Sequence, residues 1–153
     1  MLVAAGDAWA EFAGGTSGVL WGAGIRAAGL ALGDTGWPEA ADVVRAWRSW
    51  VGALSELGKA KIGDKTILDA AVPFVDALES NIDAGVVEAW RKAAEVADDA
   101  AQQTAQLAPR IGRARPLAAR SIGNPDPGAV SFAICVHAAL SALGQDQAET
   151  SGE

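Results

Sequence analysis

The sequence has no tyrosine, one cysteine, one histidine and one methionine in 153 residues, and its 12 basic residues are outnumbered by 19 acidic ones. A single cysteine, Cys135, excludes an internal disulfide and suits a reducing compartment, and its apolar helical surroundings predict a buried thiol. His137 has no Cys, His or carboxylate partners at zinc-ligand spacing, so we expect a packed or surface imidazole. The net charge of −7 argues against DNA or RNA as a partner, because phosphate backbones are bound by basic faces.

Long apolar runs and strand-like patterns are also missing. The longest apolar run, Gly18 to Leu32, is broken by Arg26, and the N-terminus has no basic segment, so we expect neither a membrane span nor a signal peptide. Runs of β-branched or aromatic residues with a period of two are absent and alanine dominates, which predicts an all-α fold. The length suits one domain with its own core, and the expected location is the cytoplasm.

Apolar residues recur at helical spacing in six segments, separated by glycine and proline signals. We expect Thr16 or Ser17 to cap the second segment, and Thr66 followed by Asp69 resembles a capping box for the fourth. The predicted domain covers residues 1–143, and residues 144–153 are predicted to form a frayed polar tail. The expected helices cover about residues 2–13, 18–32, 38–57, 66–78, 86–107 and 129–143.

The spacing of glycine, tryptophan and proline residues predicts how some of the helices pack and bend. A series of glycines in the second segment predicts close approach of two helix backbones; these are Gly18, Gly22, Gly29 and Gly33. Trp47 and Trp50 are expected to lie in the core, with a partner-facing patch as the alternative. Pro73 falls inside the fourth segment and is expected to kink it.

The segment from Arg113 to Gly128 contains three arginines, three prolines and an Asp-Pro-Gly turn between two apolar helical segments. So much guanidinium in a connection indicates an anion-binding loop. The alternative is that these arginines neutralise the preceding helix end and pair with acidic neighbours. In an antiparallel bundle this loop would share one end with the Gly14–Gly18 turn and the Gly58–Thr66 loop. Free amides at helix starts and nearby glycines could together bind phosphate, although ordinary capping explains most such turns.

Three motifs carry a resemblance to a known family. They are Gly14-Gly-Thr-Ser-Gly18, Gly63-Asp-Lys-Thr-Ile-Leu-Asp-Ala70, and the segment from Gly112 to Gly128. In order and spacing they resemble motifs of the nucleotide-binding L subunit (DhaL), or DAK2 domain, of dihydroxyacetone kinase. The resemblance implies an antiparallel helical barrel, with about six of the family's eight helices in this chain. It also implies ADP or ATP with Mg²⁺ at one end, and a K subunit (DhaK) as the partner that holds dihydroxyacetone covalently.

The resemblance also implies roles for individual residues. Thr16 and Ser17 would contact the nucleotide phosphates, and Arg113 would contact the nucleotide. Gly58 and Ile67 would border the nucleotide. The remaining three residues would close the pocket: Asp126, Pro127 and Gly128.

The family's metal site has no counterpart in this sequence. The resemblance implies magnesium ligands in an Asp-x-Asp-His-Gly type motif, and Asp7 and Asp34 do not lie in such a motif. We therefore expect no metal ligand here and assign no catalytic residue. The isolated chain is expected to be inactive as a kinase, and to require self-association or another chain that supplies the missing helices.

Three functions are compatible with these motifs. The first is the L-type component of a dihydroxyacetone (glycerone) kinase, a phosphotransferase whose donor would be ATP or a phosphoprotein. The second is a non-catalytic DhaL-like binding module. The third is the DAK2 part of another kinase, such as a fatty-acid kinase.

Overall fold

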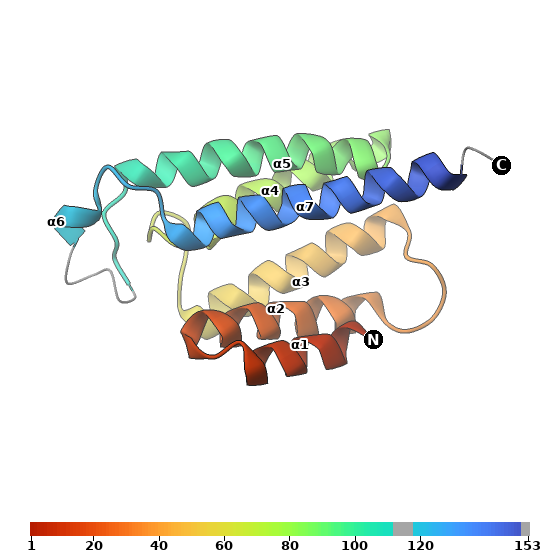
Figure 1. Ribbon diagram of the computed structural model, residues 1–153, viewed down its shortest axis with the longest axis horizontal. Helices are drawn as coiled ribbons and strands as arrows, with labels where there is room; N and C mark the ends of the chain where they lie inside the picture. The colour runs from red at the N-terminus through yellow and green to blue at the C-terminus, as the bar shows by residue number, and fades with distance from the viewer. Residues whose placement is uncertain (112–117, 151–153) are drawn as a thin grey trace. The chain divides into compact units, whose positions relative to one another are not determined.

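The computed structural model describes residues 1–111 and 118–150, which contain helices and no strand, as the sequence predicts (Figure 1). The chain divides into two compact units, Met1–Lys61 and Ile62–Glu153. All six predicted helical segments are present. The helices are α1 (Leu2–Phe12), α2 (Gly15–Leu32), α3 (Ala40–Gly58), α4 (Leu68–Asn81), α5 (Val86–Gln103), the short α6 (Ala118–Ser121) and α7 (Pro127–Thr150), with 3-10 turns η1 (Ile82–Ala84) and η2 (Thr104–Gln106).

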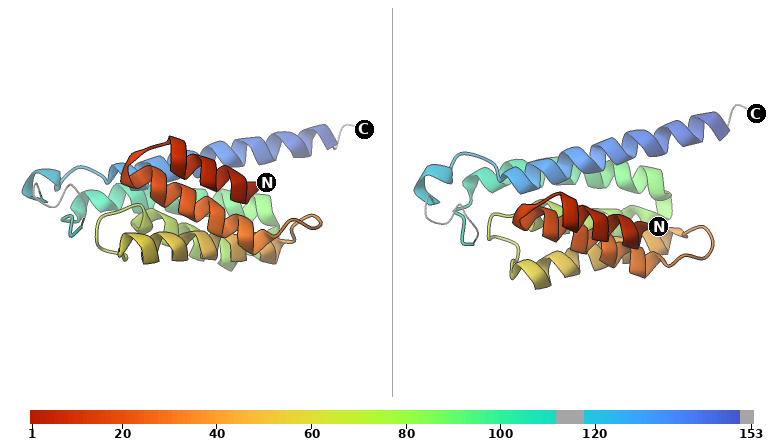
Figure 2. Two further views of the ribbon diagram at one scale, coloured as in Figure 1. Left: turned by 90° about the horizontal axis from the view of Figure 1, so that it is seen from below. Right: turned by 60° about the horizontal axis from the view of Figure 1, so that its bottom comes forward.

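The first unit consists of α1, α2 and α3, which run back and forth as consecutive antiparallel helices (Figure 2). Trp50 of α3 is buried, and its ring lies 5.3 Å from that of Trp21 and 5.6 Å from that of Trp47. The core position predicted for Trp50 is therefore confirmed, whereas Trp47 is half-buried. Gly24 of α2 makes room for this cluster, because a Cβ there would come within 2.6 Å of the Trp50 ring.

The contact between α1 and α2 is made largely by backbone. A Cβ placed on Gly22 would lie 2.6 Å from the carbonyl oxygen of Gly6, and one on Gly29 would lie 2.9 Å from Leu2. The predicted close approach is confirmed at these two glycines of α2. Gly33 has a different role, because it has φ 73° and ends α2 with open space around its Cα.

The start of α2 differs from the prediction. The helix begins at Gly15 with Gly14 as its N-cap residue, so Thr16 and Ser17 lie inside the first turn and the predicted capping role is wrong. Gly14 and Gly15 have φ near +60°, a conformation that side chains with a Cβ rarely adopt, and this lets the helix start earlier. At the start of α3, the Glu39 amide donates to the Asp42 carboxylate at 2.9 Å, which together with Arg45 lowers the pKa of Asp42.

The second unit is built on α4, α5 and α7, which lie side by side (Figures 1 and 2). The ring of Phe74 packs edge-on against those of Trp90 and Phe132, with centroids 5.4 and 5.5 Å away. Small residues on one face of α5 allow this close packing and are almost completely buried: Ala89, Ala93, Ala94, Ala97 and Ala101. Trp90 also donates from Nε1 to the Val136 carbonyl at 2.8 Å. Pro73 lies inside α4, as expected.

Two predictions about the last helix are wrong. α7 continues to Thr150, seven residues beyond the predicted end at Leu143, because Gly144 is followed by good helix formers and one glycine does not terminate a helix. Cys135 is exposed, not buried. Phe132 and Val136 of the same helix are buried, whereas Ile134 is exposed. Because the exposed face of α7 also carries an apolar residue, the sequence does not show which face of the helix is buried.

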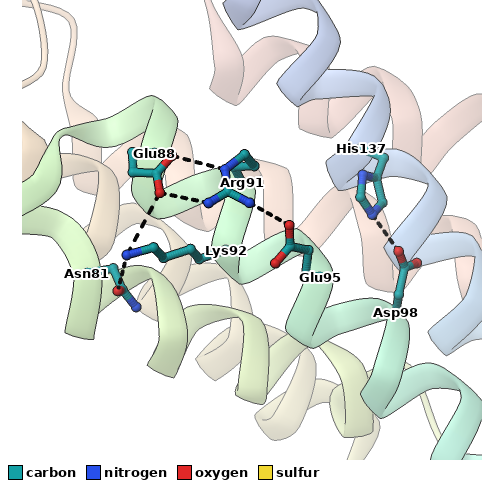
Figure 3. Close-up of polar contacts among 7 residues, drawn as sticks. All are labelled: Asn81, Glu88, Arg91, Lys92, Glu95, Asp98 and His137. Carbon is teal, nitrogen blue, oxygen red and sulfur yellow. Dashed lines mark hydrogen bonds and ion pairs between the residues drawn. The ribbon is translucent and has the colours of Figure 1, made fainter.

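The outer side of α5 carries the charged contacts drawn in Figure 3. Arg91 pairs with Glu88 and Glu95 along one helix face, and His137 Nε2 of α7 lies 2.6 Å from the Asp98 carboxylate. His137 is thus a surface imidazole with a carboxylate partner, which is one of the two states expected for it. Within the described part of the chain, no helix is long and apolar enough to cross a membrane.

Candidate functional site

A buried lysine joins two loops at one end of the second unit. Lys65 precedes α4, and its Nζ donates to the carbonyl oxygens of Leu107, Ser121 and Asn124 at 3.0, 2.6 and 2.8 Å. Only 5% of Lys65 is exposed, and its backbone has φ 60°. The Arg110 amide adds a backbone bond to the Asp64 carbonyl at 3.2 Å. The predicted meeting of the third and fifth connections is therefore present within this unit.

Asp69 organises the chain that leads into α4. Its carboxylate accepts from the amides of Gly63 and Thr66, at 2.5 and 2.7 Å. The Thr66 hydroxyl accepts from the Leu68 amide at 3.2 Å. Asp69 bonds back to the Thr66 amide as predicted, but the predicted cap at Thr66 is wrong. α4 begins at Leu68 with Ile67 as its N-cap residue, so Thr66 precedes the cap and its hydroxyl bonds the Leu68 amide, not that of Asp69.

Asp126 starts α7 and is anchored to the end of α5. Its amide donates to the Thr104 hydroxyl at 2.7 Å, and Thr104 donates in turn to the Ala101 carbonyl at 2.6 Å. The Asp126 carboxylate accepts from the Ala129 amide at 2.8 Å, which is N-cap geometry with Pro127 at the first helical position. Burial raises the pKa of Asp126, and the hydrogen bonds from Ala129 and Gly128 only partly offset this effect.

Ile67 lies against the Asp-Pro-Gly turn. A Cβ on Gly128 would be 2.9 Å from Asp126 Oδ2 and 3.4 Å from the Ile67 Cβ, so these residues are in close contact. Four of the residues implied by the family resemblance therefore come together here: Ile67, Asp126, Pro127 and Gly128.

Three other residues implied by the resemblance belong to the first unit. Thr16 and Ser17 are exposed in the first turn of α2, where no side chain caps the free amides and nothing lies within 4 Å of a Cβ on Gly14 or Gly15. Gly58 is the last residue of α3. A Cβ built on Gly58 would lie 3.5 Å from the Leu20 side chain of α2. Antiparallel pairing thus brings the start of α2 and the end of α3 to the same end of this unit. Arg113 lies outside the described residues.

Sequence reasoning missed Lys65 and Thr104. In the sequence, Lys65 is part of a motif that lacks the Gly-Lys-Ser/Thr order of a phosphate-binding loop. Thr104 is a single polar residue near a predicted helix end, so neither residue suggests a buried hydrogen-bond network. Both are buried and bond to chain segments distant in sequence. Among the side chains that the structure describes, no group of three or more His, Cys, Asp or Glu residues is placed to hold a metal ion.

Residues 1–141 match the family described as the DAK2 domain. The chain belongs to this family. It is 55% identical over 137 residues to a protein named D-erythrulose kinase from Mycolicibacterium smegmatis, covering 88% of this chain and 24% of that protein. It is 46% identical over 153 residues to an L-erythrulose kinase of Pectobacterium atrosepticum, covering 99% and 26%.

A smaller DAK2 protein is also similar. The ADP-binding subunit DhaL of the PEP-dependent dihydroxyacetone kinase of Escherichia coli is 37% identical over 120 residues, covering 77% of this chain and 57% of the subunit. Among solved structures, the dihydroxyacetone kinase of C. freundii matches with a TM-score of 0.64 and 27% identity, over 90% of this chain and 22% of that one. This DAK2 chain therefore spans about a quarter of the erythrulose kinases that it matches.

Proposed function

We propose that this DAK2 domain binds ADP or ATP and acts as the nucleotide-binding, L-type component of a kinase for a small ketose. The acceptor would be dihydroxyacetone or the related erythrulose, held by a K-type (DhaK-like) partner. Support comes from relatives named as erythrulose kinases and as an ADP-binding subunit of a dihydroxyacetone kinase. A cytoplasmic location and association with a further chain, or with a second copy, belong to the same proposal.

The observation that carries this proposal is the contact of Ile67 with the Asp126–Gly128 turn at one end of the second unit. Ordered glycine and proline backbone at a helix start, next to an apolar side chain, suits one side of a nucleotide pocket. The free amides at the start of α2, in the first unit, are suited to phosphate oxygens. By family resemblance we also assign Thr16, Ser17, Gly58 and Arg113 to nucleotide binding.

Phosphoryl transfer requires positioning and charge stabilisation more than covalent chemistry by the protein. In this proposal the amides of residues 15–17 and the Arg113 guanidinium are ligands for phosphate oxygens. The Asp126–Gly128 turn is assigned to nucleotide binding on the evidence of the second unit alone. Magnesium would neutralise developing charge on the phosphates, and the described side chains include no group of three or more His, Cys, Asp or Glu residues placed to hold it. We therefore assign no step through a metal to this chain.

The test is ADP binding measured by calorimetry on the full chain and on Arg113→Ala. Loss of one charge-assisted contact should weaken binding by about 1.5–3 kcal/mol. Arg91→Ala is the matched control, because it removes the same charge from the exposed face of α5, where Arg91 pairs with Glu88 and Glu95. Equal ADP affinity of the wild type and Arg113→Ala would contradict the assignment.

A kinase component and a non-catalytic binding module differ in turnover. Mixing the chain with ATP, magnesium and a K-type subunit loaded with dihydroxyacetone should give no phosphorylated product until a protein carrying the Asp-x-Asp-His-Gly helices is added. Product formation only after that addition supports the kinase component. ADP binding with no turnover in either mixture supports the binding module, and turnover with another acceptor supports the DAK2 part of a different kinase.

A further inference from the structure

The three hydrogen bonds of Lys65 leave its ammonium group no proton for a phosphate. An ammonium group has three donors, and all three are directed to backbone carbonyl oxygens 2.6 to 3.0 Å away. The residue is also buried, with 5% of its surface exposed. A lysine in a Gly-Asp-Lys-Thr loop would otherwise be a natural candidate for a phosphate ligand.

The three acceptors of Lys65 come from both sides of the connection between α5 and α7. Leu107 follows η2, whereas Ser121 and Asn124 precede the Asp126–Gly128 turn. Because one ammonium group binds all three, it holds the beginning and the end of this connection against the entry to α4. Two further bonds complete the attachment, from the Gly123 amide to the Ala105 carbonyl at 2.7 Å and from the Asp126 amide to Thr104.

The backbone at Lys65 adopts a conformation that costs free energy for a residue with a side chain. Lys59 and Lys65 are the non-glycine residues with positive φ in the described part of the chain, at 52° and 60°. Lys59 caps α3 and is exposed, so its side chain has no comparable network of buried acceptors. Position 65 combines a strained backbone with a buried charge. A buried charge costs free energy unless it is hydrogen-bonded, as that of Lys65 is.

We propose that Lys65 is a positioning residue, which sets the Asp126–Gly128 turn for nucleotide binding through three carbonyl oxygens and does not itself contact phosphate. The part of this inference that concerns nucleotide rests on the proposed function above. The part that concerns the loop rests on the hydrogen bonds alone, so the two can be tested separately.

Lys65→Gly and Lys59→Gly form a matched pair of variants. Glycine suits the positive φ at both positions, so both variants should fold, and Lys59→Gly should be neutral or slightly stabilising. Amide hydrogen exchange is measured at Gly123 and Asp126. In Lys65→Gly we expect these two amides to exchange about tenfold faster, the factor that corresponds to the loss of about one net hydrogen bond, while amides of α4 and α5 are unchanged.

Chemical rescue distinguishes the ammonium group from general packing. Butylammonium chloride replaces the deleted side chain of Lys65→Gly and should restore slow exchange, whereas tetramethylammonium chloride, which has no N–H donor, should not. If Gly123 and Asp126 exchange as slowly in Lys65→Gly without butylammonium as they do in the wild type, the inference is overturned. A uniform acceleration across the second unit would also overturn it, because it would show that Lys65 only stabilises the fold.

ADP affinity tests the second half of the inference. Lys65→Gly should bind ADP at least about tenfold more weakly, and butylammonium should restore the affinity together with slow exchange. Weaker ADP binding with unchanged Gly123 and Asp126 exchange would identify Lys65 as a direct ligand and overturn the positioning role. If the wild-type chain binds no ADP, the proposed function fails, and the exchange measurements still decide whether Lys65 positions the turn.

Discussion

Gly6 of α1 and Gly22 of α2 exclude a side chain from each other's position. A Cβ on Gly6 would lie 2.7 Å from the Gly22 carbonyl oxygen, and a Cβ on Gly22 would lie 2.6 Å from the Gly6 carbonyl oxygen. Since both obstacles are backbone atoms, no rotamer change can relieve the clash. Gly22→Ala should therefore push the helices apart and destabilise the first unit by about 1–3 kcal/mol, measured by denaturant unfolding.

Gly52→Ala is the control for this prediction. Gly52 lies in the interior of α3, is exposed, and has nothing within 4 Å of a Cβ built on it. Alanine there should raise the free energy of unfolding by about 0.5–1 kcal/mol, because it restricts the unfolded chain. Equal effects of the two substitutions would show that the close helix contact is not present in solution.

Thr104→Val tests the anchor between α5 and the Asp126–Gly128 turn. The Thr104 hydroxyl is buried and accepts from the Asp126 amide, so valine would leave this amide without a partner. We expect a loss of about 1–3 kcal/mol in the free energy of unfolding. Thr104→Ser keeps the hydroxyl and should cost less, about the value of one buried methyl group. A serine variant as unstable as the valine variant would contradict the hydrogen-bonding role.

Trp50→Ala and Trp37→Ala should differ strongly in stability. Trp50 is 3% exposed and packs on Trp21 and Trp47, so its truncation should cost about 3–5 kcal/mol. Trp37 is 97% exposed, and its truncation should change stability by less than about 0.5 kcal/mol. Iodide quenching offers an independent measurement: the quenchable fraction of tryptophan emission should fall in Trp37→Ala. An unchanged fraction would place Trp37 in a protected position.

Asp126 should make stability dependent on pH in an unusual direction for a carboxylate. Because burial raises its pKa above the unfolded value, the folded state holds the proton more tightly. Its contribution to stability is therefore greatest below the unfolded pKa of about 3.9 and is lost as the pH rises through the folded pKa. Asp126→Asn should remove this loss, while its side-chain oxygen still accepts from the Ala129 amide.

Thermal unfolding between pH 3.5 and 7 measures this effect. The melting temperature of Asp126→Asn relative to wild type should increase with pH across the lower part of this range. Asp99→Asn, which removes a carboxylate from an exposed position on α5, is the control for the loss of one negative charge. A constant difference between Asp126→Asn and wild type would show that Asp126 has the same pKa in the folded and unfolded states.

The helices could be predicted from the sequence because apolar periodicity and glycine or proline breaks are local signals. Their ends were less accessible. At α2 the decisive feature is the positive φ of Gly14 and Gly15, which moves the start ahead of the Thr16–Ser17 pair that resembles a cap. At α7 a single glycine suggested an end that the surrounding helix formers override.

The candidate site shows the same division between local and distant signals. The family motifs named Ile67 and Gly128 separately, and their contact is seen only in the structure. The hydrogen bond of Asp69 to Thr66 was visible in the spacing of the two residues. The network of Lys65 joins residues 42, 56 and 59 positions apart, and backbone carbonyls as acceptors leave no trace in residue type. Such a network is found only once the chain is folded.

The uneven distribution of tryptophan between the two units allows the unfolding of each unit to be followed by intrinsic fluorescence. Five of the six tryptophans lie in the first unit, and Trp90, in the core of the second, donates a hydrogen bond to Val136. With no tyrosine to add background, a Trp90→Phe variant reports unfolding of the first unit alone by fluorescence. Subtracting its denaturation curve from that of the wild type isolates the second unit, so the cooperativity between the two units can be measured without a label.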